Sequence, residues 1–417
     1  MERLKRLQEL VFKNDSKILF WVFDGIGGLP HGETGKTELE TAHIPAIDAF
    51  ARSASCGGLV PHGQGITPGS GPGHLSLFGY PLDAFDLPRG VLEVLGAEGA
   101  FRRGEWVGEV EPRAGDLTMR GNFASLEERD GQLVVADRRA NRIATEESRR
   151  VCELLSRRLT LEGYEIFVFP GKEHRFALLI RGDGLVGGVS ESDPQKSGLP
   201  PQKVEALVPQ AEESARVINA VSAQAMELLS DEKEANGVLL RGIGCPPAIP
   251  TLEELYGIKA AAIATYPMYR GIARLLGMDV LEVGSMKHED QVRTLEEHFD
   301  SYDFFYLHIK ETDSVAHKGD FDAKVKIFEA CDSLFERALE LDFDVVALSG
   351  DHCTPCVLGD HSWHPIPTAL WSRTVLNGGV ESFDERQVRK GTMGMVASRD
   401  LMPLALAEAG RFNKYGA

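Results

Sequence analysis

The sequence predicts an α/β fold in which a mostly parallel sheet carries helices on both faces. Strand-like and helix-like segments alternate over residues 1–95 and again over residues 260–417. The strand-like segments are almost continuously apolar, which is typical of parallel strands covered on both faces. In addition, acidic and histidine side chains directly follow several of these strands.

The individual elements follow from local pattern. The N-terminal part predicts a leading helix, a strand at 17–23 and a helix at 37–54. Further strands are expected where apolar runs end in polar loops, and helices where apolar residues recur at helical spacing. The C-terminal part predicts strands at 260–265, 279–283, 302–309 and 345–349, and helices at 271–278, 288–300 and 320–341.

The middle of the chain shows a different pattern. Alternating segments at 132–136, 165–169 and 175–180 are separated by Gly, Asp and Pro turns. A loop at 189–202 and a long helix at 208–234 follow. We therefore predict an α+β domain, residues 98–249, inserted into an α/β domain formed by residues 1–97 and 250–417.

Composition excludes some classes of function. The 417 residues carry a net charge of −18, which argues against nucleic acid or an anionic membrane as the main partner. No apolar run approaches the ~20 residues of a membrane helix, and the charged N-terminus does not resemble a signal peptide, so a cytoplasmic protein is expected. Six scattered cysteines suit reduced thiols. The sequence leaves open whether the protein forms a homo-oligomer.

Metal-type ligands follow three predicted strands. Asp24 follows the first; Asp313 and His317, four residues apart and so on one face of a helix, follow the second. Asp351 and His352 follow the third, and His361 comes shortly after. Ligands in open α/β sheets gather at the carboxyl ends of strands. The set can hold two divalent cations, which makes a two-metal phosphoryl-transfer centre the leading hypothesis.

Ser70 is the candidate nucleophile, because glycine and proline on both sides leave its hydroxyl unshielded. A plain turn serine is the alternative. His74 is expected to cap the following helix, with orientation of a substrate as the alternative. The run 30–37 resembles a nucleotide-binding P-loop, but Pro30 replaces its first glycine, so a turn capped into a helix at Thr37 is expected. Cys353 and Cys356 are read as small buried residues rather than a redox pair.

Eight motifs in order resemble one known family over nearly the whole chain. They are FDGIGG, GKTELETAHIPAIDAFA, ITPGSGPGHLSLFGY, MRGNFASL, ADRRANRI, KETDSVAHKGDFDAKV, GDHCTP and HSWHPIP. The chain resembles the archaeal-type 2,3-bisphosphoglycerate-independent phosphoglycerate mutases, within the alkaline phosphatase superfamily. The resemblance implies an alkaline-phosphatase-like catalytic domain, an inserted substrate-binding lid, a phosphoserine intermediate and no 2,3-bisphosphoglycerate.

The resemblance also implies roles for single residues. One divalent ion would take Asp313, His317 and His361, and the other Asp24, Ser70, Asp351 and His352. The ions would be Mn²⁺ or Zn²⁺, with Mg²⁺ or Co²⁺ as alternatives. Lys310 would neutralise charge or transfer a proton, with a surface lysine as the alternative. The residues implied to bind a small phosphorylated acid are Arg120, Asn122, Asp137, Arg138, Arg139, Arg142, His174, Arg175 and Arg270. A solvated charged turn is the alternative for 137–142.

The implied reaction interconverts 3-phosphoglycerate and 2-phosphoglycerate, as in glycolysis. Ser70 would take the phosphoryl group, and the trapped glycerate would reorient and recover it on its other hydroxyl. The chain departs from the family pattern at Gly28, Gly71, His364 and Arg270, which bears on the substrate more than on the metals. The alternatives are a two-metal phosphatase or phosphotransferase for another phosphorylated or phosphonate acid, a non-catalytic metal-binding protein, and a P-loop kinase.

Overall fold

The computed structural model describes residues 2–85 and 87–416, which form two compact units. The first unit comprises Met1–Phe85 and Ile249–Ala417, and the second comprises Asp86–Ala248. The sequence placed this division at 98 and 249. The first boundary lies earlier because α5 (Arg89–Gly96) packs on the second unit, where Val94 shares a core cluster with Phe167 and Phe169.

The first unit contains an eight-stranded sheet with β12, β1 and β13 side by side at its centre. Only β14 runs antiparallel to its neighbours among the pairs described, so the predicted mostly parallel sheet is confirmed. In spatial order the strands are β11 (Asp279–Val280), β10 (Ala260–Ile263), β12 (Phe304–Ile309), β1 (Ile18–Phe23), β13 (Val345–Ser349), β14 (Ile366–Ser372), β2 (Ser55–Val60) and β15 (Gly394–Ala397).

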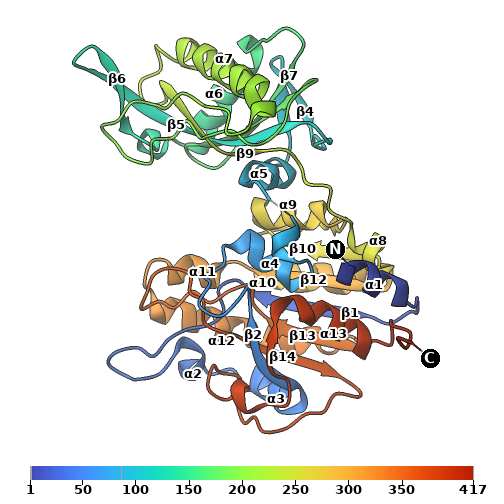
Figure 1. The fold of residues 1–417 in the computed structure, drawn as a ribbon. Helices are drawn as coiled ribbons and strands as arrows, with labels where there is room; N and C mark the ends of the chain where they lie inside the picture. Colours follow the sequence, from blue (N-terminus) through green and yellow to red (C-terminus); the bar gives the residue numbers. More distant parts are fainter. Residues whose placement is uncertain (1, 86, 417) are drawn as a thin grey trace. The chain divides into compact units, whose positions relative to one another are not determined.

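Helices lie on both faces of this sheet, as the sequence predicted (Figure 1). Every residue of β1, β12 and β13 is buried, which explains why these strands are almost continuously apolar. The helices of this unit are α1 (Glu2–Leu10), α2 (Glu38–Thr41), α3 (Pro45–Ser53), α4 (Ser70–Leu77), α8 (Leu252–Tyr256), α9 (Pro267–Leu275), α10 (His288–His298), α11 (Glu311–Ala316), α12 (Phe321–Ala338) and α13 (Leu401–Glu408).

Several helices differ from their predicted limits, and proline explains most of the differences. The single helix predicted at 37–54 is two helices, because Ile44, which precedes Pro45, has a non-helical backbone (φ −128°, ψ 61°). The helix predicted at 271–278 begins earlier, with Pro267 in its first turn. Thr37 caps α2 in a capping box, which confirms the turn-and-cap interpretation of the P-loop-like run.

The second unit is an α+β layer built on a seven-stranded antiparallel sheet. Helices α6 (Thr145–Arg158) and α7 (Glu212–Leu228) share its main hydrophobic core. Helix α7 is shorter than the helix predicted at 208–234, since it begins at Glu212 and ends at Leu228. The strands are β3 (Ala100–Arg102), β4 (Glu105–Gly108), β5 (Leu117–Arg129), β6 (Gln132–Asp137), β7 (Glu165–Pro170), β8 (Arg175–Arg181) and β9 (Gly237–Gly244).

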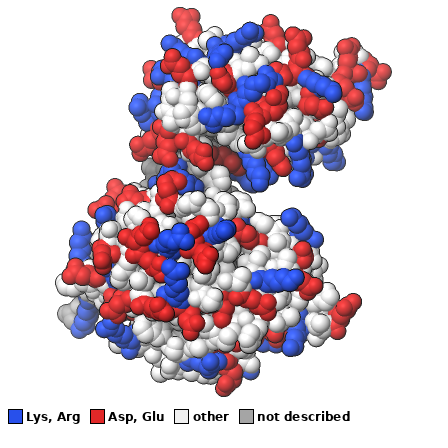
Figure 2. Space-filling model, turned by 180° about the vertical axis from the view of Figure 1, so that it is seen from behind, with Lys and Arg blue, Asp and Glu red and all other residues white. Residues whose placement is uncertain are grey.

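Acidic and basic side chains are interspersed over both units on the face that Figure 2 displays. Within residues 2–85 and 87–416, no helix has the length and apolar character needed to cross a membrane. The six cysteines are free, and Cys353 and Cys356 are buried, as the sequence indicated.

Candidate active site

Three aspartates meet at the carboxyl edge of the first unit's sheet. Asp24 follows β1, Asp313 lies in α11 just after β12, and Asp351 lies just beyond β13. These strands are direct neighbours, with β1 hydrogen-bonded to β12 on one side and to β13 on the other. Parallel strands end at the same edge, so the three buried carboxylates converge as the sequence predicted.

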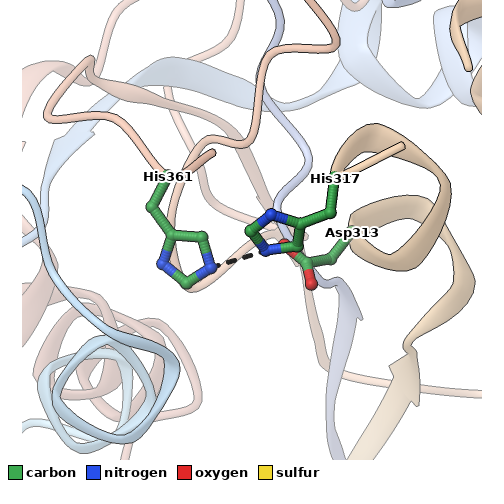
Figure 3. A group of neighbouring side chains, drawn as sticks. All are labelled: Asp313, His317 and His361. Atoms are coloured by element: carbon green, nitrogen blue, oxygen red, sulfur yellow. Dashed lines mark ion pairs between the residues drawn. The ribbon is translucent and has the colours of Figure 1, made fainter. Parts of the chain in front are cut away.

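One group of candidate ligands consists of Asp313, His317 and His361 (Figure 3). Asp313 Oδ1 lies 3.4 Å from His317 Nε2 and 3.6 Å from His361 Nε2. The two histidines are held through their other nitrogens, because His317 Nδ1 contacts the Gly359 carbonyl and His361 Nδ1 the Pro68 carbonyl, each at 3.0 Å. Both Nε2 atoms therefore face the carboxylate, an arrangement typical of metal-binding histidines.

A second group, Asp24, Asp313 and His352, lies deeper and is wholly buried. His352 Nε2 lies 3.3 Å from Asp24 Oδ1 and 3.2 Å from Asp351 Oδ2. Burial lowers the pKa of His352, so the ring is held in the neutral form that binds a metal. Asp313 belongs to both groups, so any two ions held by them would be close neighbours.

Ser70 is the first residue of α4, beside the second group. Its Oγ lies 3.3 Å from His352 Nε2. His74, one turn further, lies inside the helix rather than capping it, so that expectation is wrong. Its Nδ1 is 2.9 Å from the Ser70 carbonyl oxygen and 3.1 Å from Asp351 Oδ2, so this buried imidazole joins the serine turn to a candidate ligand.

Lys310 lies between two of the carboxylates. Its Nζ is 3.1 Å from Asp24 Oδ2 and 2.5 Å from Asp313 Oδ2. Burial by itself would lower the pKa of Lys310, but Asp24 and Asp313 raise it above its usual value. The side chain is 14% exposed, so Lys310 is a largely enclosed cation within the site.

The centre is suited to divalent cations on its own chemistry. Burial opposes the charge of Asp24, but Lys310, His308 and His352 nevertheless hold its pKa well below the usual range. Both oxygens of Asp24 and Oδ2 of Asp351 are buried, and in the described part of the chain they meet ion-pair partners but no aligned hydrogen-bond donor. Three carboxylates face one lysine, so added positive charge would stabilise the site. Mixed oxygen and nitrogen donors suit Mn²⁺ and Zn²⁺.

Two side chains that line the centre, His308 and Tyr269, were not anticipated from the sequence. His308 Nε2 is 3.2 Å from Asp24 Oδ2, and its ring stacks on Tyr269 at 3.9 Å between centroids. His308 points inward from β12, and its position inside an apolar run could have drawn attention to it.

Arg270, next to Tyr269, pairs with Glu282 at 2.6 Å. Trp363 stacks on His364 at 4.4 Å in the loop after His361.

The second unit gathers several of the predicted substrate-binding residues. Arg120, Asn122 and His174 are buried there, and Asn122 pairs with the exposed Arg175 across β5 and β8. Burial lowers the pKa of Arg120 to about 10, with Arg89, Arg175 and Arg241 adding to the effect and Glu93 opposing it. Arg120 Nε, Asn122 Oδ1 and His174 Nδ1 are buried without a partner in the described residues. Concentrated positive charge beside unpaired polar atoms suits an anion.

The turn at 137–142 has mixed roles. Asp137 accepts backbone hydrogen bonds from Arg139 (2.9 Å) and Asn141 (2.7 Å), so it shapes the turn. Arg138 makes two hydrogen bonds to Asp193, at 2.9 and 2.6 Å. Arg139 and Arg142 are exposed. Arg241, which faces Arg120 across the β5–β9 pair, was not anticipated, because strand pairing over this sequence distance has no local signal.

Fold and site thus define an α/β protein with a buried carboxylate–histidine centre at the carboxyl edge of its sheet. A family profile described as 2,3-bisphosphoglycerate-independent phosphoglycerate mutase matches residues 51–235. A Thermotoga neapolitana protein named "Probable 2,3-bisphosphoglycerate-independent phosphoglycerate mutase" is 44% identical over 418 residues, covering 100% of both chains. A Thermus thermophilus protein of the same name is 43% identical over 420 residues, again covering 100% of both.

Solved structures agree. A cofactor-independent phosphoglycerate mutase from Thermoplasma acidophilum is 30% identical with a TM-score of 0.71, covering 95% of this chain and 100% of that one. A Pyrococcus horikoshii protein has a TM-score of 0.81 at 25% identity, covering 97% and 100%. The chain belongs to the 2,3-bisphosphoglycerate-independent phosphoglycerate mutases, and it is an isomerase that does not use 2,3-bisphosphoglycerate.

Proposed function

We propose that the enzyme interconverts 3-phosphoglycerate and 2-phosphoglycerate through a phosphoserine at Ser70, with two divalent cations at the strand-edge centre. Asp313, His317 and His361 would hold one ion, and Asp24, Ser70, Asp351 and His352 the other. The convergence of these side chains from three neighbouring strand ends is the observation that carries the proposal. When bound, the ions would favour the deprotonated serine and neutralise phosphate charge.

The chain's own residues account for the remaining requirements. Ser70 Oγ forms the bond to phosphorus, and the bond from phosphorus to the substrate oxygen breaks, which leaves glycerate. The phosphoryl group then returns to the other glycerate hydroxyl, and Ser70 regains its original form. Lys310 is a cation held in place by Asp24 and Asp313, so it can neutralise charge as it develops on the transferred group.

Substrate binding is assigned to the cationic cluster of the second unit. A phosphoglycerate carries a carboxylate and a phosphate, and the planar guanidinium group binds both anions through paired N–H groups. Arg120, Arg175 and Arg241 supply such groups around the unpaired atoms of Asn122 and His174. Arg138 is already paired with Asp193, so it would position the turn rather than contact the anion directly. Arg139 and Arg142 complete the proposed set in this unit, and Arg270, which pairs with Glu282 in the first unit, is the remaining candidate.

The test measures 2-phosphoglycerate and free phosphate formed from 3-phosphoglycerate by metal-stripped protein refilled with Mn²⁺. Ser70→Ala should abolish 2-phosphoglycerate formation, while the ion held by Asp313, His317 and His361 should remain bound. Ser76→Ala is the matched control, because that hydroxyl lies on the same helix but donates to the Pro61 carbonyl. Wild-type turnover in Ser70→Ala would remove the serine from the reaction. Free phosphate as the main product would show hydrolysis in place of transfer.

A further inference from the structure

A buried lysine lies behind the candidate site without touching a candidate ligand. Lys324, on α12, is 0% exposed. Its Nζ donates to the carbonyl oxygens of Gly25 (2.9 Å), Gly27 (3.3 Å) and Thr354 (2.9 Å). An ammonium group has three N–H donors, so these carbonyls occupy all of them.

The three carbonyls belong to the two loops that carry Asp24 and His352, which are two of the three residues of the second group of candidate ligands. Gly25 directly follows Asp24, and Thr354 comes two residues after His352. The Thr354 hydroxyl donates to Asp313 Oδ1 at 2.7 Å and lies 3.0 Å from His352 Nδ1. One ammonium group therefore ties the loop of Asp24 to a threonine that in turn contacts ligands from both other strand ends.

Two glutamates hold the outer sides of the same loops. Glu38 Oε1 accepts from the Cys356 N–H at 2.9 Å, and Glu385 Oε1 accepts from the Gly28 N–H at 2.6 Å. The Glu38 carboxylate is fully buried against Gly28, where a Cβ atom would overlap its Oε2. The absence of a side chain at position 28 thus makes room for an acid supplied by α2. Lys324 and these carboxylates fix each loop from two directions.

Packing alone does not account for a lysine at this position. Burying an ammonium group carries a desolvation cost, whereas a methionine of similar length would fill the same space without it. What the ammonium group adds is directed bonding to three carbonyls, each on a loop next to a candidate ligand. Groups that orient metal ligands without touching the metal commonly change metal affinity or activity ~10–100-fold when mutated.

We propose that Lys324 is a positioning residue of this enzyme. It aligns the Asp24 and Asp351–His352 loops, so that the second group of candidate ligands forms a preformed metal site. This role rests on the proposed two-metal function. It predicts that Lys324 acts on metal affinity and kcat. The KM for 3-phosphoglycerate should be unchanged, because the three N–H groups of Lys324 bond to loop carbonyls and to none of the proposed substrate-binding residues.

The experiment compares Lys324→Met and Lys324→Arg with wild type in the full chain. Lys326→Met is the matched control, since it removes an exposed lysine two residues further along the same helix. Mn²⁺ binding to the metal-stripped proteins is measured by calorimetry at a temperature where circular dichroism shows each protein folded. Then kcat and KM are measured at saturating Mn²⁺. We expect Lys324→Met to weaken Mn²⁺ binding at least ~10-fold and lower kcat similarly. Lys324→Arg should fall between Lys324→Met and wild type, and the control should match wild type.

Folded Lys324→Met with wild-type Mn²⁺ affinity and kcat would overturn the role and leave Lys324 as a core residue. If Lys324→Met does not fold, Lys324→Arg decides, because a guanidinium plane cannot place N–H groups on all three carbonyls as an ammonium does. Wild-type affinity and kcat in that variant would likewise overturn the role. A wild-type protein that binds no Mn²⁺ would instead contradict the proposed function itself, so the two failures are distinguishable.

Discussion

Gly25 is where backbone conformation and the candidate site depend on each other most directly. Its φ is +61°, in the left-handed region that glycine adopts readily. A Cβ atom there would overlap the Thr354 hydroxyl and lie 3.0 Å from Asp313 Oδ1. Gly25→Ala should therefore strain the backbone and also push Thr354 away from the carboxylate.

The expected size follows from these two effects. Placing an L-residue in the left-handed region costs ~1 kcal/mol. Loss of a hydrogen bond to a charged group adds ~1.5–3 kcal/mol, here the 2.7 Å bond from Thr354 to Asp313. We therefore expect Gly25→Ala to lower the free energy of unfolding of the metal-free protein by about 3 kcal/mol. Mn²⁺ affinity should fall as well, because Asp313 belongs to both candidate groups.

The control is Gly35→Ala. Gly35 has nearly the same backbone angle (φ +65°), but a Cβ atom at this position would meet no other atom within 4 Å, so only the ~1 kcal/mol backbone cost applies. Urea unfolding gives the free energies, and calorimetry gives the Mn²⁺ affinity. Equal destabilisation by the two substitutions, with equal Mn²⁺ affinity, would refute this reasoning. It would show that close packing of Gly25 against Thr354 does not hold Asp313 in place.

Two further predictions concern the metals and the anion cluster. His317→Gln should weaken one Mn²⁺ site and Asp24→Asn the other, so a two-site binding isotherm in which both substitutions affect the same site would contradict the assignment of the two groups to two ions. Burial, with Arg175 adding to it, lowers the pKa of His174 to about 4. The folded state therefore favours the neutral imidazole, and its stabilising contribution is lost as the pH falls from ~6.5 towards 4. Nuclear magnetic resonance should show this ring titrating near pH 4, and at higher pH once 3-phosphoglycerate binds; an unchanged titration would place the anion elsewhere.

The sequence was most informative about the sheet and the ligands at its edge. Strands buried on both faces are nearly continuously apolar, so β1, β12 and β13 were visible as runs. Parallel strands end at one edge, so the polar residues that followed each run could be assigned to a common site before any geometry was known. The helix cap at Thr37 could likewise be predicted from the sequence, because it depends only on neighbouring residues. Helix limits could not be predicted in the same way, because Pro45 begins α3 inside a segment read as one helix, and Pro267 begins α9 before the predicted start.

What the sequence could not show depends on contacts between distant segments. His74 was expected to cap a helix, because nothing in its neighbourhood indicates that its ring reaches Asp351. Arg241 faces Arg120 only because β9 pairs with β5, and that pairing follows from the packed sheet rather than from either strand's composition. Lys324 sits in an ordinary amphipathic helix pattern, in which a lysine is normally placed on the solvated face. Its role depends on the direction in which its side chain enters the core.

The acidic composition of the chain does not conflict with an anionic substrate. A net charge of −18 repels a long polyanion that would lie along much of the surface, although salt screens this repulsion beyond the Debye length of ~8 Å. A small phosphorylated acid responds instead to charges within a few ångströms, which are buried and poorly screened. Buried Arg120, with Arg175 and Arg241 nearby, supplies such a positive field in the second unit. The three carboxylates of the first unit repel an anion on their own, so the proposed phosphoryl transfer requires cations that reverse the sign of the field there. Metal removal should therefore abolish phosphoryl transfer while leaving anion binding at the arginine cluster measurable by calorimetry. Loss of both together would show that the two properties are not separate.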